Sequence, residues 1–296
     1  MNTLIIGGNG YIGSYLYSKL DADSIDLCLF GKDLGYSKKI NYNETDISGY
    51  KNIILLAGHS SIQMCESSKN NAWINNVDYF YNICQKLSSN QLLIYASSSS
   101  VYGVTNIISE ETTINLNPIN IYDLTKVTID IIANKFISEG KNIIGLRFGT
   151  VNGKSVNTRS DLMINSMLLN YKNNNNIKIK NEWVKRPLLG IEDLTNGILS
   201  ILNSNVVVSG QYNMSSFNTQ VKEVANIIKK KTGCQIIKIK DDDKYYDFQI
   251  SSKKFQNTFN FKFKDTLDTI IDNLLESDFV DFSSRPTDNL LILNKS

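Results

Sequence analysis

Short apolar runs alternate with longer amphipathic stretches through the first half of the chain. The runs are rich in isoleucine and leucine and are bounded by turn residues, which is typical of buried strands. The stretches between them repeat apolar residues with a helical period. The pattern predicts strands at residues 3–6, 25–30, 53–57, 92–96 and 143–147, and helices at residues 11–20, 73–87 and 122–138.

This order of strands and helices predicts the fold. A strand, a helix and a second strand in succession form a βαβ crossover, and repeated crossovers build a parallel sheet with helices on both faces. We therefore expect an α/β protein whose core is a doubly wound parallel sheet of the Rossmann type. In such a sheet a ligand binds beyond the carboxyl ends of the strands.

The pattern loosens after residue 150. We expect this part to form a smaller α/β substrate lobe, with residues 1–152 and 188–210 in the Rossmann domain and residues 153–187 and 211–296 in the lobe. The tail from residue 277 has no clear period and receives no assignment. The remaining predictions are helices at 162–171, 193–202, 221–232 and 267–275, strands at 206–208 and 212–214, and a loop at the asparagine tract 173–176.

Composition narrows the classes of function. The 296 residues carry a net charge of +2, which argues against nucleic acid or an anionic membrane as the main partner. A single histidine, His59, leaves no multi-histidine metal site, so we expect no metal. The four cysteines show no CxxC spacing, and no apolar run approaches the roughly 18 residues of a membrane span. We expect a cytoplasmic protein with reduced thiols.

A glycine-rich turn links the first predicted strand to the first predicted helix. Two overlapping patterns, GxGxxG and GxxGxxG, occupy residues 7–13. Glycines in this context allow a tight turn and let the backbone approach a pyrophosphate, which the amides of the helix N-terminus then bind. We therefore expect a dinucleotide here, beside Gly7, Gly10, Tyr11, Ile12 and Gly13.

The end of the second predicted strand bears on the choice between NAD and NADP. An acidic side chain at this position binds the ribose 2′-hydroxyl in NAD-binding proteins. Here Gly31 takes that position and Lys32 follows, and an ammonium would favour a 2′-phosphate. We therefore expect NADP, with NAD as the alternative if Lys32 is solvated and Asp33 reaches the ribose instead.

Tyr122 and Lys126 are four residues apart and share one face of a predicted helix. A phenol becomes an effective acid or base near neutral pH only if its pKa falls by about 3 units, and a nearby ammonium lowers it. The pair alone is a common pattern. The serine run at residues 97–100 follows the fourth predicted strand, however, so a hydroxyl would lie at the same edge of the sheet and could bind the reacting oxygen.

The glycine-rich turn, the serine run, the Tyr122–Lys126 pair and the segment LRFGTVNG at residues 146–153 follow one another in this order. With these motifs the chain resembles an extended short-chain dehydrogenase/reductase of the NAD-dependent epimerase/dehydratase family, which acts on nucleotide sugars. The resemblance runs from residue 1 to about residue 230. It implies that Tyr122 is the catalytic acid or base, that Lys126 holds the nicotinamide ribose, and that Ser98 is the catalytic hydroxyl. It also implies that the cofactor is contacted by Asp46, Ile47, Ala57 and Gly58, with His59 in a nearby loop.

Two departures from the family pattern refine this expectation. The 4,6-dehydratases of the family carry Asp-Glu after the catalytic hydroxyl, whereas Ser99 and Ser100 stand here, so we do not expect dehydration. The absent acid after the second strand suggests a dissociable NADP(H). We therefore expect a 4-keto sugar reductase that uses NADPH. The alternatives are a C4 epimerase or C4 oxidase that uses NAD and, less favoured, a non-catalytic dinucleotide-binding regulator.

The resemblance extends to the substrate lobe. Asn165 and Arg186 match positions that meet the diphosphate of a nucleotide sugar, and a guanidinium forks well onto phosphate oxygens. The expected substrate-binding residues are Ser98, Ser99, Tyr122, Asn165 and Arg186. As in related dimers, the helices at 73–87 and 122–138 are expected to pair across a two-fold axis, which predicts a homodimer.

Overall fold

The computed structural model of the chain describes residues 2–26, 33–40, 44–112, 116–242 and 245–277. Within these ranges its centre is a seven-stranded parallel sheet in the order β11-β7-β5-β4-β1-β2-β3. The chain adds strands to one side of β1 as far as β3 and then to the other side from β4 to β11. This confirms the doubly wound Rossmann-type fold. The strands are β1 (Thr3–Ile6), β2 (Asp23–Asp26), β3 (Lys38–Lys39), β4 (Asn52–Leu55), β5 (Leu92–Ser98), β7 (Asn142–Phe148) and β11 (Gly210–Met214).

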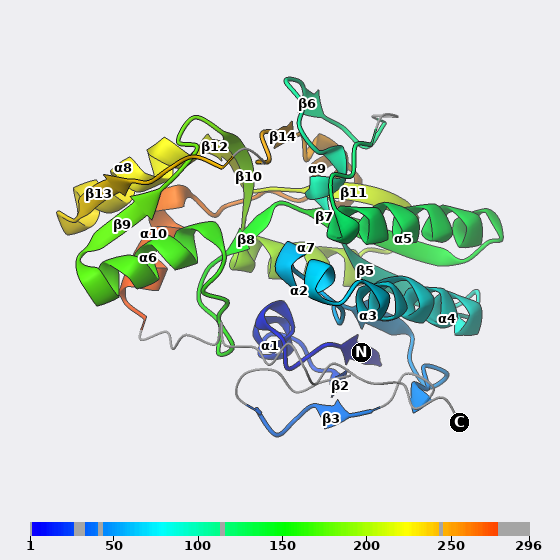
Figure 1. The fold of residues 1–296 in the computed structure, drawn as a ribbon. Helices are drawn as coiled ribbons and strands as arrows, with labels where there is room; N and C mark the ends of the chain where they lie inside the picture. The colour runs from blue at the N-terminus through cyan, green and yellow to red at the C-terminus, as the bar shows by residue number, and fades with distance from the viewer. Residues whose placement is uncertain (1, 27–32, 41–43, 113–115, 243–244, 278–296) are drawn as a thin grey trace.

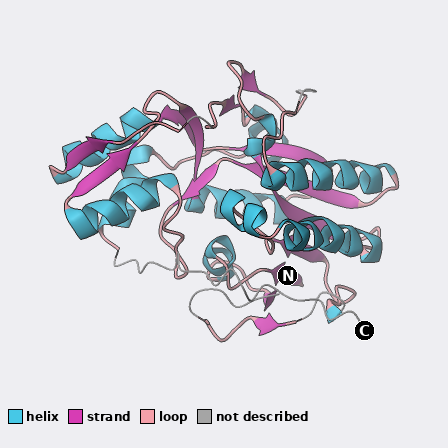
Figure 2. Cartoon of the chain, viewed as in Figure 1, coloured by secondary structure: helices cyan, strands magenta, loops and turns pink. Residues whose placement is uncertain are grey.

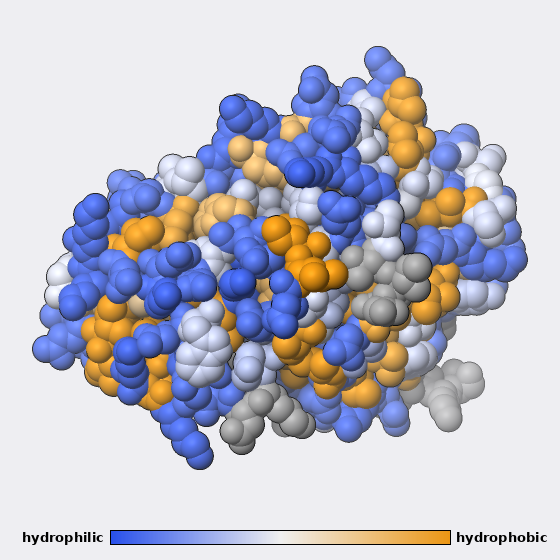
Figure 3. Space-filling model, turned by 90° about the horizontal axis from the view of Figure 1, so that it is seen from above, coloured by the Kyte–Doolittle hydropathy of each residue, from blue (hydrophilic) through white to orange (hydrophobic). Residues whose placement is uncertain are grey.

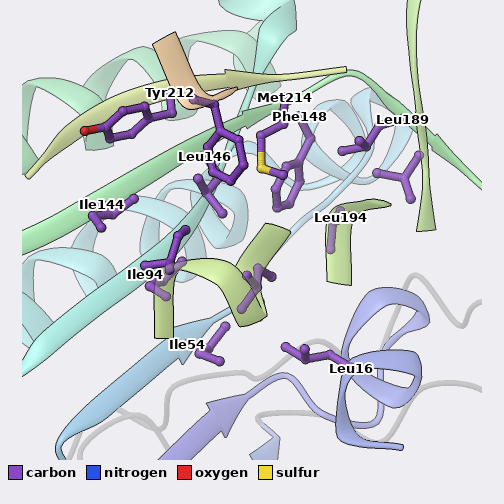
Figure 4. Packing of buried hydrophobic residues seen from close by; sticks show 14 of the residues in the cluster. Leu16, Ile54, Ile94, Ile144, Leu146, Phe148, Leu189, Leu194, Tyr212 and Met214 are labelled. Carbon is purple, nitrogen blue, oxygen red and sulfur yellow. The ribbon is translucent and has the colours of Figure 1, made fainter. Parts of the chain in front are cut away.

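Both faces of the sheet are buried, because successive side chains of a strand point to opposite sides. Ile5 and Ile54 lie in a core on one face, which Figure 4 shows, while Leu4 and Ile53 lie in a core on the other. Figures 1 and 2 show the resulting three layers. The covering helices are α1 (Tyr11–Tyr17), α7 (Ile191–Leu202) and α9 (Lys253–Phe259) on the first face, and α4 (Tyr79–Lys86) and α5 (Ile121–Ser138) on the second.

A smaller group of elements, at the left of Figure 1, surrounds a core of its own. In this core α6, α8 and α10 pack on the parallel pair β9 and β13. A three-stranded sheet of β12, β10 and β8 joins this group to the large sheet, and β6 pairs with β14 nearby. The bounds are β6 (Ile108–Ser109), β8 (Thr150–Asn152), α6 (Met163–Asn174), β9 (Asn176–Ile179), β10 (Lys185–Gly190), β12 (Phe217–Gln220), α8 (Val221–Thr232), β13 (Gln235–Lys238), β14 (Gln249–Ile250) and α10 (Leu267–Leu275).

Several boundaries differ from the sequence prediction. Residues 206–208 form no strand and their valine side chains are exposed, because the edge strand β11 begins only at Gly210. Helix α6 continues into the asparagine tract as far as Asn174, and Asn175 ends it in a left-handed conformation. Residues 211–214, expected in the substrate lobe, pair with β7 in the large sheet instead.

The helix predicted at residues 73–87 is interrupted. The structure has α2 (Ile62–Ser67) and α3 (Lys69–Trp73), then a π-helical turn at Ile74–Asp78 and then α4. Two asparagines, Asn75 and Asn76, are buried in the π-helical turn. Such turns occur frequently at functional sites.

Exposed apolar side chains lie in separate places on the surface. One group, Val104, Ile107 and Ile108, lies on and before β6, and Figure 3 shows the face that carries β6 as hydrophilic with apolar patches. No helix in the described ranges is both long enough and apolar enough to cross a bilayer. Cys65, Cys84 and Cys234 are free and buried, and Cys28 lies outside the described residues.

Candidate active site

The glycine-rich turn packs directly against the end of β4. Gly7 has a φ of +99°, and a Cβ there would lie 2.5 Å from the backbone nitrogen of Ala57. A Cβ on Gly13 would lie 2.0 Å from the carbonyl oxygen of Gly7. Neither position has room for a side chain, so the turn keeps the bare backbone that a pyrophosphate requires.

Tyr11, at the start of α1, is tied to the loop that follows β8. Its hydroxyl donates to the Gly153 carbonyl at 2.8 Å, and the Ser155 hydroxyl donates to the Tyr11 carbonyl at 2.8 Å. The buried Tyr11 side chain therefore holds the loop after β8 in place. A contact between the Tyr11 backbone amide and the cofactor stays a prediction. Ile12 is partly buried and packs on the core beneath the sheet.

An acidic side chain lies at the carboxyl end of β2, where the sequence analysis expected none. Asp26 is the last described residue of the strand, and its buried carboxylate accepts the backbone N–H of Asn9 in the glycine-rich turn at 3.0 Å. The described part of β2 begins two residues before the predicted strand, because α1 ends at Tyr17, before residue 20. Asp26 thus offers an acid beside the turn, while Gly31 lies outside the described residues and the choice of NADP stays a prediction. Lys32 itself lies outside the described residues.

Asp46 and Ile47 lie between β3 and β4. The Asp46 carboxylate is exposed and accepts the Ser48 N–H at 2.9 Å, a hydrogen bond that lowers the pKa of this carboxyl. The Ile47 side chain is buried in the core behind the sheet. A contact between adenine and these residues stays a prediction, and for Ile47 it would involve the backbone.

The segment after β4 is fixed by Asn76, a residue that the sequence analysis missed. Its amide oxygen accepts the His59 N–H at 2.8 Å, and its NH₂ group donates to the His59 carbonyl at 3.1 Å and to the Thr125 hydroxyl at 3.0 Å. Gly58 has a φ of +141°, and a Cβ there would lie 2.5 Å from the Asn76 amide oxygen. Two adjacent asparagines, Asn75 and Asn76, interrupt a predicted apolar helix. This interruption is the sequence signal that could have identified Asn76.

His59 is buried and uncharged. Burial lowers the pKa of its imidazole to about 4, and its Nδ1 atom lies 3.2 Å from the side-chain nitrogen of Asn75. The neutral imidazole therefore lies in the segment after β4, and the expected position of His59 near the cofactor stays a prediction.

Ser98, Tyr122 and Lys126 come together at the carboxyl end of β5. Ser98 is the last residue of the strand, and Tyr122 and Lys126 lie in the first turns of α5, which Asn120 caps by accepting the Asp123 N–H at 3.0 Å. The Ser98 side chain acts to lower the pKa of the Tyr122 phenol, so the two side chains lie close together. The Lys126 ammonium lies 5.7 Å from the centre of the Tyr122 ring.

Burial dominates the electrostatics of this group. Burial raises the pKa of the Tyr122 phenol to about 12, although the Ser98 side chain and the positive charge of Arg159 act to lower it. The Lys126 ammonium donates to the Ala96 carbonyl at 2.8 Å, and burial lowers its pKa to about 8. Burial thus outweighs the opposing charges in this arrangement of side chains, and the fall of the Tyr122 pKa that acid–base catalysis near neutral pH needs stays a prediction.

Arg159 is a second residue that the sequence analysis did not assign to the site. Its guanidinium donates to the Ser60 carbonyl at 3.0 Å and forms an ion pair with Asp161 at 2.6 Å. It joins the loop after β8 to the loop after β4, and its charge acts on Tyr122. This contact links residues 99 positions apart, so no local pattern could reveal it.

The side chains of two predicted substrate-binding residues make hydrogen bonds within the protein. Asn165 is fully buried, and its amide group donates to the Arg159 carbonyl at 2.8 Å and accepts the Gly153 N–H at 3.4 Å. The buried Ser99 hydroxyl donates to the Phe148 carbonyl at 2.8 Å. Both side chains therefore hold loops together, and direct substrate contacts from them stay predictions.

Arg186 on β10 is held from two sides. One of its terminal nitrogens donates to the Thr150 hydroxyl at 3.2 Å, and the guanidinium lies 5.5 Å from the centre of the Tyr246 ring. Its Nε atom is buried and has no hydrogen-bond partner within the described part of the chain. Burial lowers the pKa of this guanidinium. A buried cation with an unpaired donor fits an anionic ligand such as a diphosphate.

Comparison with solved structures places the fold among nucleotide-sugar enzymes. MoeE5 in complex with UDP-glucuronic acid and NAD superposes with a TM-score of 0.82 at 19% identity, covering 93% of this chain and 98% of that one. UDP-glucuronic acid 4-epimerase from Bacillus cereus gives a TM-score of 0.80 at 16% identity, covering 93% and 98%. dTDP-glucose 4,6-dehydratase from Bacillus anthracis str. Ames gives 0.77 at 19%, covering 93% and 94%.

Sequence comparison gives a relative and a family. ADP-L-glycero-D-manno-heptose-6-epimerase of Brachyspira hyodysenteriae (strain ATCC 49526 / WA1) is 29% identical over 178 residues, which are 52% of this chain and 56% of the relative. The chain thus matches only a little more than half the length of that curated relative. The model of the NAD dependent epimerase/dehydratase family matches residues 3–215, and the chain belongs to this family of enzymes.

Proposed function

We propose that the protein is an NAD-dependent C4 epimerase of a nucleoside-diphosphate sugar. The observation that carries the proposal is that the same edge of the sheet holds the Asp26 carboxylate, at the end of β2, and the group of Ser98, Tyr122 and Lys126, at the end of β5. The first would select the dinucleotide and the second would act on the sugar.

The glycine-rich turn and Asp26 fit NAD. Close backbone packing at Gly7 and Gly13 excludes a side chain from the turn, which keeps the bare backbone that a pyrophosphate requires. A carboxylate beside this turn accepts hydrogen bonds from a ribose 2′-hydroxyl and repels a 2′-phosphate. The named solved structures with this fold hold NAD, which supports this choice.

The proposed reaction exchanges a proton and a hydride at C4. The dinucleotide, when bound, supplies the hydride acceptor and donor. Tyr122 would take the proton of the 4-hydroxyl as C4 is oxidised and return it as the ketone is reduced on its other face. Ser98 would hydrogen-bond the reacting oxygen, and Lys126 would bind the nicotinamide ribose. Arg186 would hold the diphosphate.

A net reduction of a 4-keto sugar is the second candidate. It is favoured by the high pKa of Tyr122, about 12, because the phenol form is the one that protonates a ketone oxygen. In this case Asp26 would select NADH as the reductant, while the argument for NADPH rests on Gly31 and Lys32, which lie outside the described residues.

The test is a panel of UDP-, dTDP-, GDP- and CDP-sugars with NAD, NADH, NADP and NADPH, followed by NMR of the products. Epimerisation without net change in absorbance at 340 nm supports the epimerase. Stoichiometric NADH consumption with a 4-keto sugar supports the reductase, and exclusive use of NADPH would contradict both.

The assignment of Tyr122 can be tested separately. We expect Tyr122→Phe to lower kcat by at least about 100-fold, because it removes the acid and base, and to leave the dinucleotide Kd unchanged. Undiminished turnover would reject the assignment.

A further inference from the structure

Tyr246, in the segment before β14, lies between two groups of the proposed site. Its hydroxyl donates to the Asp123 carboxylate, whose two oxygens lie 2.7 and 2.9 Å away. Its ring faces Arg186, with the guanidinium carbon 5.5 Å from the ring centre. One side chain therefore contacts both the cation on β10 and the residue that follows Tyr122 on α5, and the proposed mechanism gives it no role.

The hydroxyl end of Tyr246 is fixed by the first turn of α5. Asp123 has an exposed fraction of 0%, and it also accepts the Ile119 N–H at 3.1 Å and the Asn120 side-chain N–H at 3.0 Å. The Asn120 side chain donates to the Tyr246 hydroxyl as well, at 2.5 Å. Asn120 is the N-cap of α5, and Asp123 lies in its first turn. The turn that carries Tyr122 therefore also holds the Tyr246 hydroxyl.

The ring of Tyr246 lies against a cation that has an unused donor. The Arg186 Nε atom is buried and has no hydrogen-bond partner among the described residues, and one terminal nitrogen donates to the Thr150 hydroxyl at 3.2 Å. A guanidinium within about 6 Å of the centre of an aromatic ring is attracted to the ring face. A phenol that donates its proton to a carboxylate carries more negative charge on its ring, so Asp123 strengthens this attraction.

Backbone hydrogen bonds hold the segment around Tyr246 between β10 and the loop before β6. The Asp247 carboxylate accepts the Lys185 N–H at 2.8 Å, which places the segment beside the start of β10, next to Arg186. The Asp247 carbonyl accepts the Thr105 N–H at 3.0 Å. Strand β14, which follows, pairs with β6 and lies between β6 and β10 in Figure 1. The segment is therefore attached at both sides.

Core packing accounts for only part of this arrangement. The Tyr246 ring packs on Phe248, with the ring centres 6.0 Å apart, as in an ordinary apolar core. A phenylalanine at residue 246 would make the same contact. The hydrogen bond from the hydroxyl to a buried carboxylate and the guanidinium over the ring face are polar contacts that packing does not need.

We propose that Tyr246 is a positioning residue that fixes the Arg186 guanidinium relative to the turn carrying Tyr122, so that a diphosphate bound at Arg186 places C4 of the sugar at the Tyr122 hydroxyl. The inference rests on the proposed function, in which Arg186 holds the diphosphate and Tyr122 exchanges the proton. It adds the residue that sets the distance between these two groups. Misplacing a reacting group by about 1 Å can lower a rate roughly 100-fold, so a fixed support at this point affects turnover.

The first experiment measures binding and uses no sugar. Titration calorimetry of the NAD-bound protein with UDP, dTDP, GDP and CDP gives a Kd for each, and the variants are compared with the nucleoside diphosphate that binds most tightly. We expect Tyr246→Leu to raise this Kd by about 5- to 10-fold, because the guanidinium loses the ring face. In an Arg186→Gln background the same change should have no further effect, since the cation is absent.

The second experiment separates the hydroxyl from the ring. Tyr246→Phe keeps the ring against Arg186 and removes the hydrogen bond to Asp123. We expect the nucleoside diphosphate Kd to stay within about 3-fold of the wild type, while kcat with the accepted sugar nucleotide falls by about 10-fold. Tyr245→Leu is the matched control, because Tyr245 is 37% exposed and its ring lies against Trp183. It should bind and turn over like the wild type.

The outcomes distinguish this inference from the proposed function. Wild-type binding by Arg186→Gln would reject the proposed diphosphate site and this inference with it. Weak binding by Arg186→Gln together with wild-type binding by Tyr246→Leu, or with an equal further loss in the double variant, rejects only this inference.

Equal effects of Tyr245→Leu and Tyr246→Leu would also overturn the inference, because the perturbation would then be general. If Tyr246→Leu fails to fold, Tyr246→Phe decides, and an unchanged kcat overturns the inference. The expected pattern of Kd values in a protein that converts no sugar nucleotide rejects only the epimerase.

Discussion

Asp26 places a buried carboxylate against the glycine-rich turn, and a hydrogen bond joins it to Asn9 of that turn, which Asn157 holds in turn. Its side chain accepts the Asn9 N–H at 3.0 Å, and the Asn9 carbonyl in turn accepts the Asn157 side-chain N–H at 2.6 Å. A side chain fixed in this way loses little conformational entropy when it binds a ribose, which favours tight binding.

We expect Asp26→Asn to raise the Kd for NAD by about 10- to 50-fold, because a hydrogen bond to a charged group contributes roughly 1.5–3 kcal/mol. Affinity for NADP should be unchanged or higher, since the variant lacks the charge that repels a 2′-phosphate. Titration calorimetry with both dinucleotides measures this. Asp33→Asn is the matched control, because Asp33 is exposed and was the other acid available to the ribose. A larger effect from Asp33 than from Asp26 would show that the assignment is wrong.

At the scale of elements, local sequence patterns predicted much of the molecule but not the contacts between distant segments. The bounds of α8 and α10 agree with the periodicity of their apolar residues, because each buries one face on a neighbouring core. The start of β2 at Asp23 was missed because the apolar run lies further along the chain, and pairing with β1 and β3 shows where the described part of the strand lies. Tyr122 and Lys126 were predicted from their local spacing and Ser98 from the family resemblance, whereas Arg159 reaches this group through a contact with the distant Ser60.

The π-helical turn at Ile74–Asp78 supports the site through Asn76. We expect Asn76→Ala to reduce the free energy of unfolding by about 2–4 kcal/mol, because it leaves the buried His59 N–H without a partner and removes one hydrogen bond each from the His59 carbonyl and the Thr125 hydroxyl. Urea denaturation measures this loss. Asn70→Ala, at an exposed position of α3, should change stability by less than about 0.5 kcal/mol. Equal stability of the two variants would show that the three hydrogen bonds of Asn76 contribute little.

At the scale of the whole molecule, two carboxylates fasten α7 to the segment before α10. Asp265 accepts the Asp193 N–H at 3.0 Å, while Asp193 accepts the Lys264 N–H at 2.8 Å and the Asp265 N–H at 2.9 Å. Because α7 covers the large sheet and α10 belongs to the smaller core, this contact joins the two cores. Burial raises the pKa of Asp265 to about 6, and the neighbouring negative charges of Asp193 and Glu192 add to the effect.

Because the pKa of Asp265 is raised in the folded protein, the free energy of unfolding falls as the pH rises through the range in which this carboxyl ionises. The folded protein binds a proton at Asp265 more tightly than the unfolded chain does, so the contribution is fully present below about pH 4 and is lost as the pH rises to about 6. We expect Asp265→Asn to be more stable than the wild type by about 1 kcal/mol above pH 6, allowing for solvent screening, and to show no such gain at pH 4. Urea denaturation at the two pH values, with exposed Asp21→Asn as control, measures this. A gain at pH 4 alone would reverse the sign and reject the argument.

The outer faces of α4 and α5 expose apolar side chains that a second copy of the chain would cover. Leu124 and Ile131 lie seven residues apart on one face of α5, with Ile131 62% exposed, and Tyr81 is exposed on the adjacent α4. Burying an isoleucine contributes about 1.5–3 kcal/mol, and a two-fold axis would bury it once in each copy. We therefore expect the wild type to be a dimer and Ile131→Lys to be a folded monomer, as measured by light scattering after size exclusion. Val206→Lys is the matched control, because Val206 is 64% exposed in the loop before β11 and should leave the dimer intact. A monomeric wild type, or a dimer that tolerates the lysine at residue 131, would exclude this face as the interface.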